Sequence, residues 1–262
     1  MDIDWTYVKK KTLWHYENLI GKLLDVLAYP FVQEFYNHGM PKAAAYARRM
    51  QQSYLQDGKE MAFLSEVSEQ FAAFDGLGVR DIFDLVQRVE GKTKCERFLV
   101  ETGFSFENLI LVLNYLMRYA LPFKCPIREL LDEADLEDKS ILARLRQQGI
   151  RSSLDALEGC RTQIGREKLA AESRLGEAFL LRLAHRADLT RLAYVRGKTA
   201  RHLCGGGYDT LKKLGGADIE KMEADMTAYF ASIGKRFADF KAAIPLDWMI
   251  GGARILPEVL ED

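Results

Sequence analysis

The chain contains 262 residues, of which 48% are hydrophobic and 29% are charged. This is the composition of an ordinary soluble protein that can bury a core in one large domain or two small ones. The formal net charge of −1 conceals a segregation, because residues 139–213 carry +9, residues 1–138 carry −6 and residues 214–262 carry −4.

Only six prolines in the whole chain and few runs of Val, Ile and Thr argue for helices over sheets. Pro41 is suited to the first position of a helix that includes Ala43 and Met50, and residues 60–73 continue the pattern. A long first helix is predicted from apolar residues at helical spacing, namely Leu13, Tyr16, Ile20, Leu23, Leu24 and Leu27.

The most apolar segment is Phe106–Phe123, and its polar interruptions favour a buried helix over a membrane span. The N-terminal residues lack the positive charge and the apolar stretch of a signal peptide. We therefore expect no membrane contact and a cytoplasmic location.

Known catalytic and metal-binding patterns are not matched. Gly-Lys-Thr occurs twice, but a phosphate-binding loop would need a glycine where Val86 and Leu192 stand. His202 and Cys204 are two residues apart, which places them on different faces of a helix. The four cysteines are widely spaced and are expected to be reduced and mostly buried. We predict no metal, no cofactor and no enzymatic activity, with an enzyme whose pocket lies between two domains as a remaining alternative.

A short phrase recurs along the chain: a glycine, an apolar residue, and further apolar residues at three-residue spacing. A glycine that ends one helix in the left-handed conformation, followed by Asp, Ser or Thr capping the next helix, explains the pattern locally. The repetition predicts repeated helical hairpins, although any helical protein contains some glycine C-caps followed by N-caps. The four glycines are Gly78, Gly103, Gly149 and Gly207.

Residues 187–214 are the most informative segment. They are interpreted as two short amphipathic helices joined by a tight turn at Val195, Arg196 and Gly197, and then a glycine-marked turn at 205–207 that leads into a third helix. The basic block suggests an anionic partner, and a solvated helix face balanced by the acidic segments explains it equally well. The candidate nucleic-acid-binding residues are Arg191, Tyr194, Arg196, Gly197, Lys198, Thr199 and Arg201.

From about Ile141 to Met222 the chain resembles an uncharacterised helix-hairpin-helix family, a prokaryotic domain of unknown function. The resemblance depends on the phrase Gly165-Arg166-Glu167-Lys168-Leu169-Ala170 and on Arg186-Ala187-Asp188-Leu189 before the hairpin. It implies tandem helical hairpins and no known enzymatic activity.

The hairpin departs from the usual phosphate-binding pattern. That pattern has two glycines before an alanine, and counting back from Ala200 places Tyr194 and Arg196 at the glycine positions, while Gly197 falls one residue late. A tyrosine side chain would crowd the approach of an anion to the backbone N–H groups. Basic side chains could compensate, and nucleic-acid contact then depends on whether Arg191, Arg196, Lys198 and Arg201 converge with Arg144, Arg146 and Arg166 on one face.

These observations predict an all-α protein with a helical domain of unknown role at residues 1–130 and a helix-hairpin-helix region at 131–262. The apolar tail at 244–257 is expected to pack onto the body of the protein rather than to serve as a docking peptide. The predicted function is non-catalytic contact with the backbone of DNA or RNA without sequence specificity. The alternative is a protein–protein assembly or adaptor module that uses its hairpins for packing.

Overall fold

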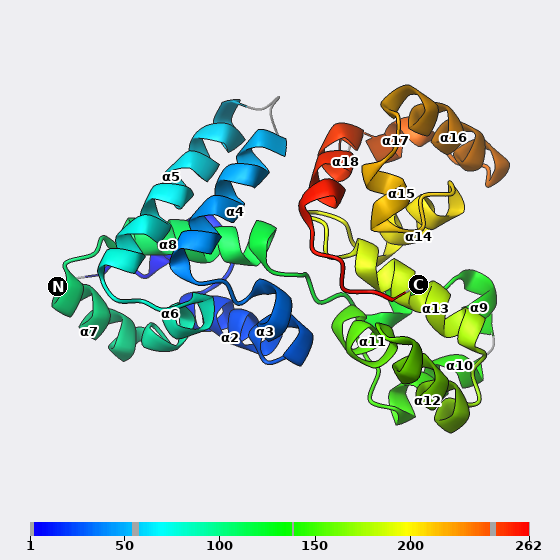
Figure 1. Cartoon of the computed structure of the whole chain (residues 1–262), viewed down its shortest axis with the longest axis horizontal. Coiled ribbons are helices and arrows are strands. Elements are labelled where there is room, and N and C mark those ends of the chain that lie inside the picture. The colour runs from blue at the N-terminus through cyan, green and yellow to red at the C-terminus, as the bar shows by residue number, and fades with distance from the viewer. Residues whose placement is uncertain (1–2, 54–57, 138, 242–244, 262) are drawn as a thin grey trace. The chain divides into compact units, whose positions relative to one another are not determined.

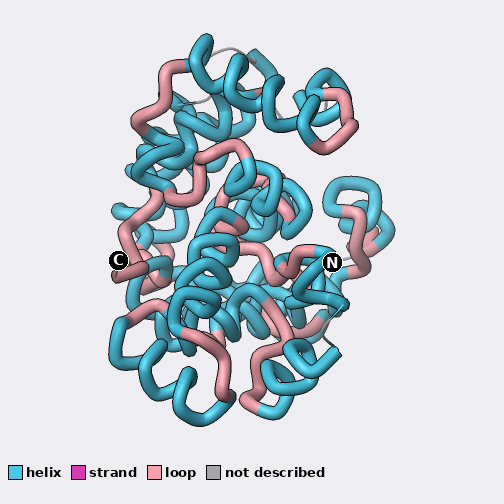
Figure 2. Tube along the Cα trace, turned by 90° about the vertical axis from the view of Figure 1, so that its right-hand side faces the viewer, coloured by secondary structure: helices cyan, strands magenta, loops and turns pink. Residues whose placement is uncertain are grey.

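The chain folds into helices joined by short loops (Figure 2). A computed structural model describes residues 3–53, 58–137, 139–241 and 245–261. Within these ranges there is no β-strand, and extended pairing is limited to two isolated bridges. The expectation of an all-α protein is confirmed.

The chain forms two compact units, Met1–Leu121 and Pro122–Asp262 (Figure 1). The described helices of the first unit are α1 (Thr6–Thr12), α2 (Tyr16–Leu27), α3 (Pro30–Tyr36), α4 (Met40–Ser53), α5 (Gly58–Gly76), α6 (Ile82–Arg88), α7 (Lys92–Thr102), α8 (Phe106–Tyr115) and the π-helical turn η1 (Leu116–Ala120).

The first unit is built around α8. Leu109, Leu113 and Tyr115 of this helix are fully or almost fully buried, and α5 packs against it together with its partner α4. The apolar segment singled out in the sequence is therefore a core helix, as predicted. No described helix of the protein combines the length and the hydropathy that crossing a membrane requires.

In the second unit the α13–α14 hairpin lies between two groups of helices. The hairpin of α13 and α14 packs against α11 and η2, and the helices α15, α16 and α18 complete the apolar cluster on the other side (Figure 1). Its described helices are η2 (Ile127–Leu130), α9 (Glu133–Glu137), α10 (Lys139–Gln147), α11 (Ser153–Cys160), α12 (Gln163–Ser173), α13 (Glu177–Leu189), α14 (Gly197–Gly205), α15 (Leu211–Gly215), α16 (Ile219–Ser232), α17 (Phe237–Lys241) and α18 (Leu246–Ile255).

The apolar C-terminal tail packs onto its own unit. It forms α18, whose residues Leu246, Met249 and Ile250 are buried against α15 and α16. The tail contributes about three large side chains to the core, each of which stabilises the fold by roughly 1.5–3 kcal/mol when it is fully buried. Self-packing of the described part of the tail is therefore confirmed.

The division between the units lies nine residues before the expected boundary at 130/131. The segment that follows Leu121 is part of the second unit because η2 places Ile127 and Leu130 in its core, where they are 2% and 0% exposed. A buried guanidinium group fixes the same segment, since Nη1 of Arg186 donates to the carbonyl of Leu130 at 2.7 Å. Arg186 and Leu130 are 56 residues apart in the sequence.

The recurring glycine phrase has the local structure that its residues predict. All four glycines have positive φ, at 69° for Gly78, 67° for Gly103, 77° for Gly149 and 94° for Gly207. Each is followed by a helix N-cap whose side chain accepts a backbone N–H bond, and these caps are Asp81, Ser105, Ser152 and Thr210. The phrase therefore marks a glycine-terminated helix followed by a capped one, in both units.

Candidate functional site

The predicted site lies on the hairpin of α13 and α14, which bends earlier than expected. α13 ends at Leu189, and α14 begins at Gly197 after a turn at residues 190–196. The short helix expected before Val195 is only the last turn of α13. The hydroxyl of Thr190 donates to the carbonyl of Ala187 at 2.7 Å, which satisfies an acceptor at the end of the helix and helps to close it there.

Tyr194 has the backbone conformation of a glycine. Its φ is 66°, in the left-handed region that L-residues with bulky side chains rarely adopt. This is one of the two positions at which the sequence pattern predicts glycine. The half-buried ring lies 6.2 Å from that of Trp248 in α18, so the tyrosine packs toward its own C-terminal helix.

Arg191 is a structural residue, contrary to the expectation that it faces a partner. Its side chain is 0% exposed, and its Nη2 forms an ion pair with Asp188 at 2.6 Å. The same Nη2 donates to the carbonyl of Pro257 at 2.9 Å. A buried guanidinium group with both an ion-pair partner and a carbonyl acceptor fixes the C-terminal segment and cannot reach a phosphate.

Gly197 and Arg196 face residues of the same unit. A Cβ at Gly197 would lie 2.5 Å from the Cβ of Glu129, so the start of α14 is in close contact with η2. The guanidinium carbon of Arg196 lies 3.4 Å from the ring centroid of Phe123. Burial raises the pKa of the Cys125 thiol, and the neighbouring Gly197 N–H and the Arg196 charge oppose that rise. The hairpin turn therefore packs against Phe123 and Glu129 of its own unit.

The basic block does not form one exposed surface. Arg166, Arg186 and Arg191 are 6%, 6% and 3% exposed, and each is hydrogen-bonded to protein carbonyls. Arg201 is half-buried and donates through Nη1 to the carbonyl of Leu131 at 2.9 Å. The seven cations therefore do not converge on one exposed face, because the buried Arg166 and Arg191 use their charge to fix flanking segments of the chain.

Lys198 and Thr199 line a surface cavity of about 560 Å³. They come from the first turn of α14, and Lys235 and Arg236 enter the same cavity from the loop between α16 and α17. His202 and Phe240 form part of its wall. These six residues are called the lysine cavity below.

The lysine cavity carries more positive than negative charge, because three cations and the single carboxylate of Asp239 line it. Lys198, Lys235 and Arg236 are exposed, and none of them lies within 4.0 Å of a carboxylate oxygen in the described chain. Burial lowers the pKa of His202 to about 4, and the nearby Lys235, Arg201 and Lys198 add to this effect. His202 is therefore neutral at pH 7, and it contacts Tyr229 through Nδ1 at 3.2 Å from the phenol oxygen.

Lys235 and Arg236 were missed by the sequence analysis because they lie outside the basic block at 139–213. A local signal marks them nonetheless. Gly234 has a φ of 65° directly after α16, and the two cations follow immediately. A glycine in the left-handed conformation ends the helix, and the pair of cations that follows it lies at the helix C-terminus. There the positive charges interact favourably with the negative end of the helix dipole.

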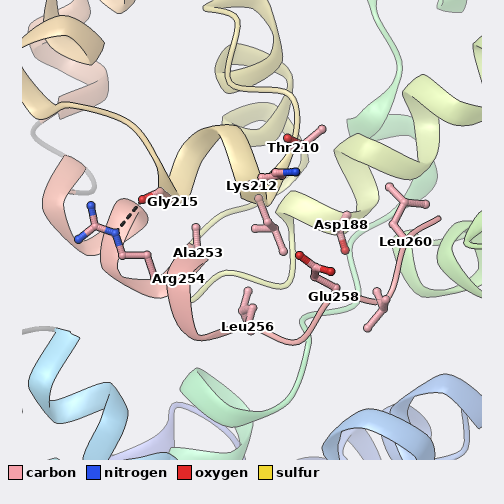
Figure 3. Close-up of a pocket in the computed structure, with 11 residues that line it drawn as sticks. Asp188, Thr210, Lys212, Gly215, Ala253, Arg254, Leu256, Glu258 and Leu260 are labelled. Atoms are coloured by element: carbon pink, nitrogen blue, oxygen red, sulfur yellow. Dashed lines mark hydrogen bonds between the residues drawn. The ribbon is translucent and has the colours of Figure 1, made fainter. Parts of the chain in front are cut away.

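A second cavity, of about 500 Å³, lies where α15 and α18 meet the C-terminal residues (Figure 3). Basic Lys212 and Arg254 surround the same space as acidic Asp188 and Glu258. The Nε of Arg254 donates to the carbonyl of Gly215 at 2.7 Å, which joins α18 to α15. Because its two cations are balanced by two carboxylates, this cavity has less attraction for a polyanion than the lysine cavity, where three cations face one carboxylate.

The cysteines are free thiols, and three of the four are buried. Burial raises the pKa of Cys95 to about 11, that of Cys160 to about 12 and that of Cys204 to about 11. Thiols with such pKa values are almost entirely protonated at neutral pH, and the protonated form is a poor nucleophile. Cys95, Cys125 and Cys160 occupy the positions of small core side chains.

Comparison with known proteins finds one family. Residues 138–235 match the family described as Domain of unknown function (DUF4332). No curated protein and no solved structure matches the chain. The second unit therefore contains a domain of unknown function. The match includes α14 and Lys235 of the lysine cavity and ends directly before Arg236.

Proposed function

We propose that the protein is a non-catalytic binding protein that contacts the backbone of DNA or RNA without sequence specificity, and that the lysine cavity makes this contact. The observation that supports the proposal is the grouping of three exposed cations without an ion-pair partner in the described chain around one cavity. Two residues of the site that the sequence predicts, Lys198 and Thr199, line this cavity.

The chemistry of the cavity suits a phosphate chain. Lysine and arginine attract phosphate oxygens, and the hydroxyl of Thr199 adds a hydrogen-bond donor beside them. The half-buried ring of Phe240 and the neutral ring of His202 offer flat surfaces on which an unpaired base could stack. Contact through flexible side chains does not require the glycine-rich backbone that the hairpin turn lacks.

The test is fluorescence anisotropy of labelled single-stranded DNA, double-stranded DNA and RNA with the full-length protein. Binding is expected at micromolar protein in about 50 mM salt and should weaken steeply as salt rises, because bound phosphates release counterions. The double variant Lys235→Gln/Arg236→Gln should weaken binding by about tenfold or more. It should also reduce the slope of log K against log salt by about 1.4 to 1.8.

The matched control is Arg146→Gln/Lys212→Gln, which removes the same charge from exposed positions outside the cavity. This variant should bind almost as well as the unmodified protein. Equal losses in the two double variants would show that only net charge matters, and no binding at micromolar protein would refute the proposal.

A second candidate is a protein–protein assembly or adaptor module. It is favoured by the hairpin turn, where Gly197 is buried against Glu129 so that the hairpin serves as a packing element. Measurement of the mass in solution and capture of partners by the full chain test this candidate. A monomer that retains no partner would count against this candidate. The nucleic-acid binding assay would then be the remaining test of function.

A further inference from the structure

A third cavity, of about 470 Å³, lies on another side of α14 and is separate from the lysine cavity. α14 contributes Arg201 and Cys204 to it, α13 contributes Arg182 and Arg186, and Tyr229 comes from α16. The cavity is called the arginine cavity below. The two cavities share no lining residue, and the contact between His202 and Tyr229 joins their walls.

Two guanidinium groups of the arginine cavity, those of the buried Arg186 and the half-buried Arg201, have a buried donor without an acceptor. The Nε atoms of Arg186 and Arg201 are inaccessible to water and have no hydrogen-bond partner. Arg186 is 6% exposed, so its Nε–H has lost hydration without compensation. Buried donors of this kind are rare in folded proteins and call for a specific explanation. A ligand atom that accepts from them when the guanidinium planes turn slightly would supply one.

Of the three guanidinium groups, Arg201 alone has no carboxylate counter-ion within 4.0 Å in the described chain. Arg186 pairs with Asp132 at 2.6 Å, and Arg182 pairs with Asp135 at 3.0 Å. Asp209, which also lines the cavity, forms an ion pair with Lys213 at 2.7 Å, and its buried Oδ1 accepts no hydrogen bond. Arg201 donates only to the neutral carbonyl of Leu131. The guanidinium charges thus leave one positive charge uncompensated, which matches a monoanion better than a phosphomonoester, whose charge is close to two.

The rest of the cavity wall suits a ligand with a compact apolar part. Ala178, Leu181 and the ring of Tyr229 line the cavity together with the thiol of Cys204. Burial raises the pKa values of Cys204 and Tyr229, so both are neutral at pH 7. A Cβ at Gly205 would collide with the Tyr229 ring, so this ring lies directly against the backbone of α14. The volume is within the range of small-molecule sites.

From this geometry we propose that the arginine cavity binds a small organic monocarboxylate, with its carboxylate on Arg201 and Arg186 and its apolar body against Leu181 and Tyr229. A planar carboxylate suits the planar fork of a guanidinium group, which can donate to both oxygens at once. This site is independent of the proposed nucleic-acid contact, because it uses none of the residues of the lysine cavity.

The test uses sodium benzoate as the probe and the full-length protein labelled with ¹⁵N-arginine. Benzoate should shift the Nε–H resonances of Arg201 and Arg186 saturably, with a dissociation constant of about 1 mM or tighter. Calorimetry should give the same constant. Arg201→Gln should weaken binding at least tenfold, and its fold is checked by circular dichroism.

Ala178→Trp provides a second variant that leaves both arginines in place. Ala178 is exposed at the start of α13 and lines the cavity, so a tryptophan there should occlude the cavity without disturbing the core. It should weaken benzoate binding at least tenfold, whereas Lys235→Gln/Arg236→Gln should leave it unchanged. That pattern would separate this site from the lysine cavity even if nucleic-acid binding failed.

Three results would overturn the proposal. The first is an Arg201 Nε–H resonance that does not move up to about 20 mM benzoate, a concentration well above the expected dissociation constant. The second is unchanged affinity in Ala178→Trp. The third is tighter binding of inorganic phosphate than of benzoate, which would identify a general anion site rather than a carboxylate site.

Discussion

His202 borders the lysine cavity on one side and contacts Tyr229 of the arginine cavity on the other. Its ring lies 4.8 Å from that of Phe230, and burial is the main reason why its pKa falls to about 4. The cations Lys235, Arg201 and Lys198 lower the pKa further. The pKa of His202 therefore depends both on its burial and on the cations around it.

The depressed pKa predicts a pH dependence of stability. In the unfolded chain His202 titrates near 6.5, so between pH 6.5 and 4 the unfolded state binds more protons than the folded one. The contribution of His202 is complete above pH 6.5 and is lost as the pH falls toward 4. His38 in the first unit, whose pKa burial also lowers to about 4, acts in the same direction.

Urea unfolding at pH 7, 6 and 5 measures this effect. The free energy of unfolding should fall with pH, and His202→Gln should make the fall shallower. A pKa near 6.5 for His202 in an NMR titration of the folded protein would contradict the prediction.

At the scale of the helices, glycine turns followed by N-caps set the helix boundaries. These boundaries were largely predictable from the sequence. The first unit uses Gly78 with Asp81, and the second uses Gly149 with Ser152. In both, the carboxylate three residues after the cap accepts a backbone N–H from the residue before the cap, which is Arg80 in one case and Arg151 in the other. All of these contacts span fewer than eight residues, so spacing alone reveals them.

The roles of the arginines were not predictable in the same way. Arg191 finds its acceptor at Pro257, and Arg201 finds its own at Leu131. These partners are 66 and 70 residues away in the sequence, so a count of charges cannot show that the groups are already used. Lys235 and Arg236 line the same cavity as Lys198 but lie outside the basic block, so a count of charges along the sequence did not reveal them.

The contact between α14 and η2 gives a prediction at the same scale. Gly197→Ala should destabilise the second unit by about 1–3 kcal/mol, because its Cβ would lie 2.5 Å from the Cβ of Glu129 and 2.8 Å from its carbonyl carbon. Gly21→Ala is the contrasting substitution, because Gly21 is exposed within α2 and a Cβ there would meet no atom within 4 Å. It should stabilise the first unit by about 0.5–1 kcal/mol. Chemical denaturation measures both, and a neutral Gly197→Ala would show that η2 does not pack on the turn.

At the scale of the whole molecule, the second unit is closed by its own C-terminal segment. Pro257 accepts from Arg191, and the carbonyl of Glu261 accepts from Nη1 of Arg166 at 2.7 Å. The N–H of Glu261 in turn donates to the carbonyl of Arg161 at 2.8 Å. Two arginines that lie within the DUF4332 match are thus satisfied by residues that lie beyond it.

Deletion of residues 257–262 should therefore destabilise the second unit selectively. Each of the buried groups Arg166 and Arg191 would lose an acceptor, at a cost of about 1–3 kcal/mol per unsatisfied group. The first unit has its own core and should unfold as before. In a Trp5→Phe/Trp14→Phe background, Trp248 is the only tryptophan, so its fluorescence follows the second unit during urea unfolding. Glu258→Ala, at an exposed position in the same segment, is the control. An unchanged Trp248 transition in the deletion variant would show that the buried arginines do not depend on the C-terminal segment.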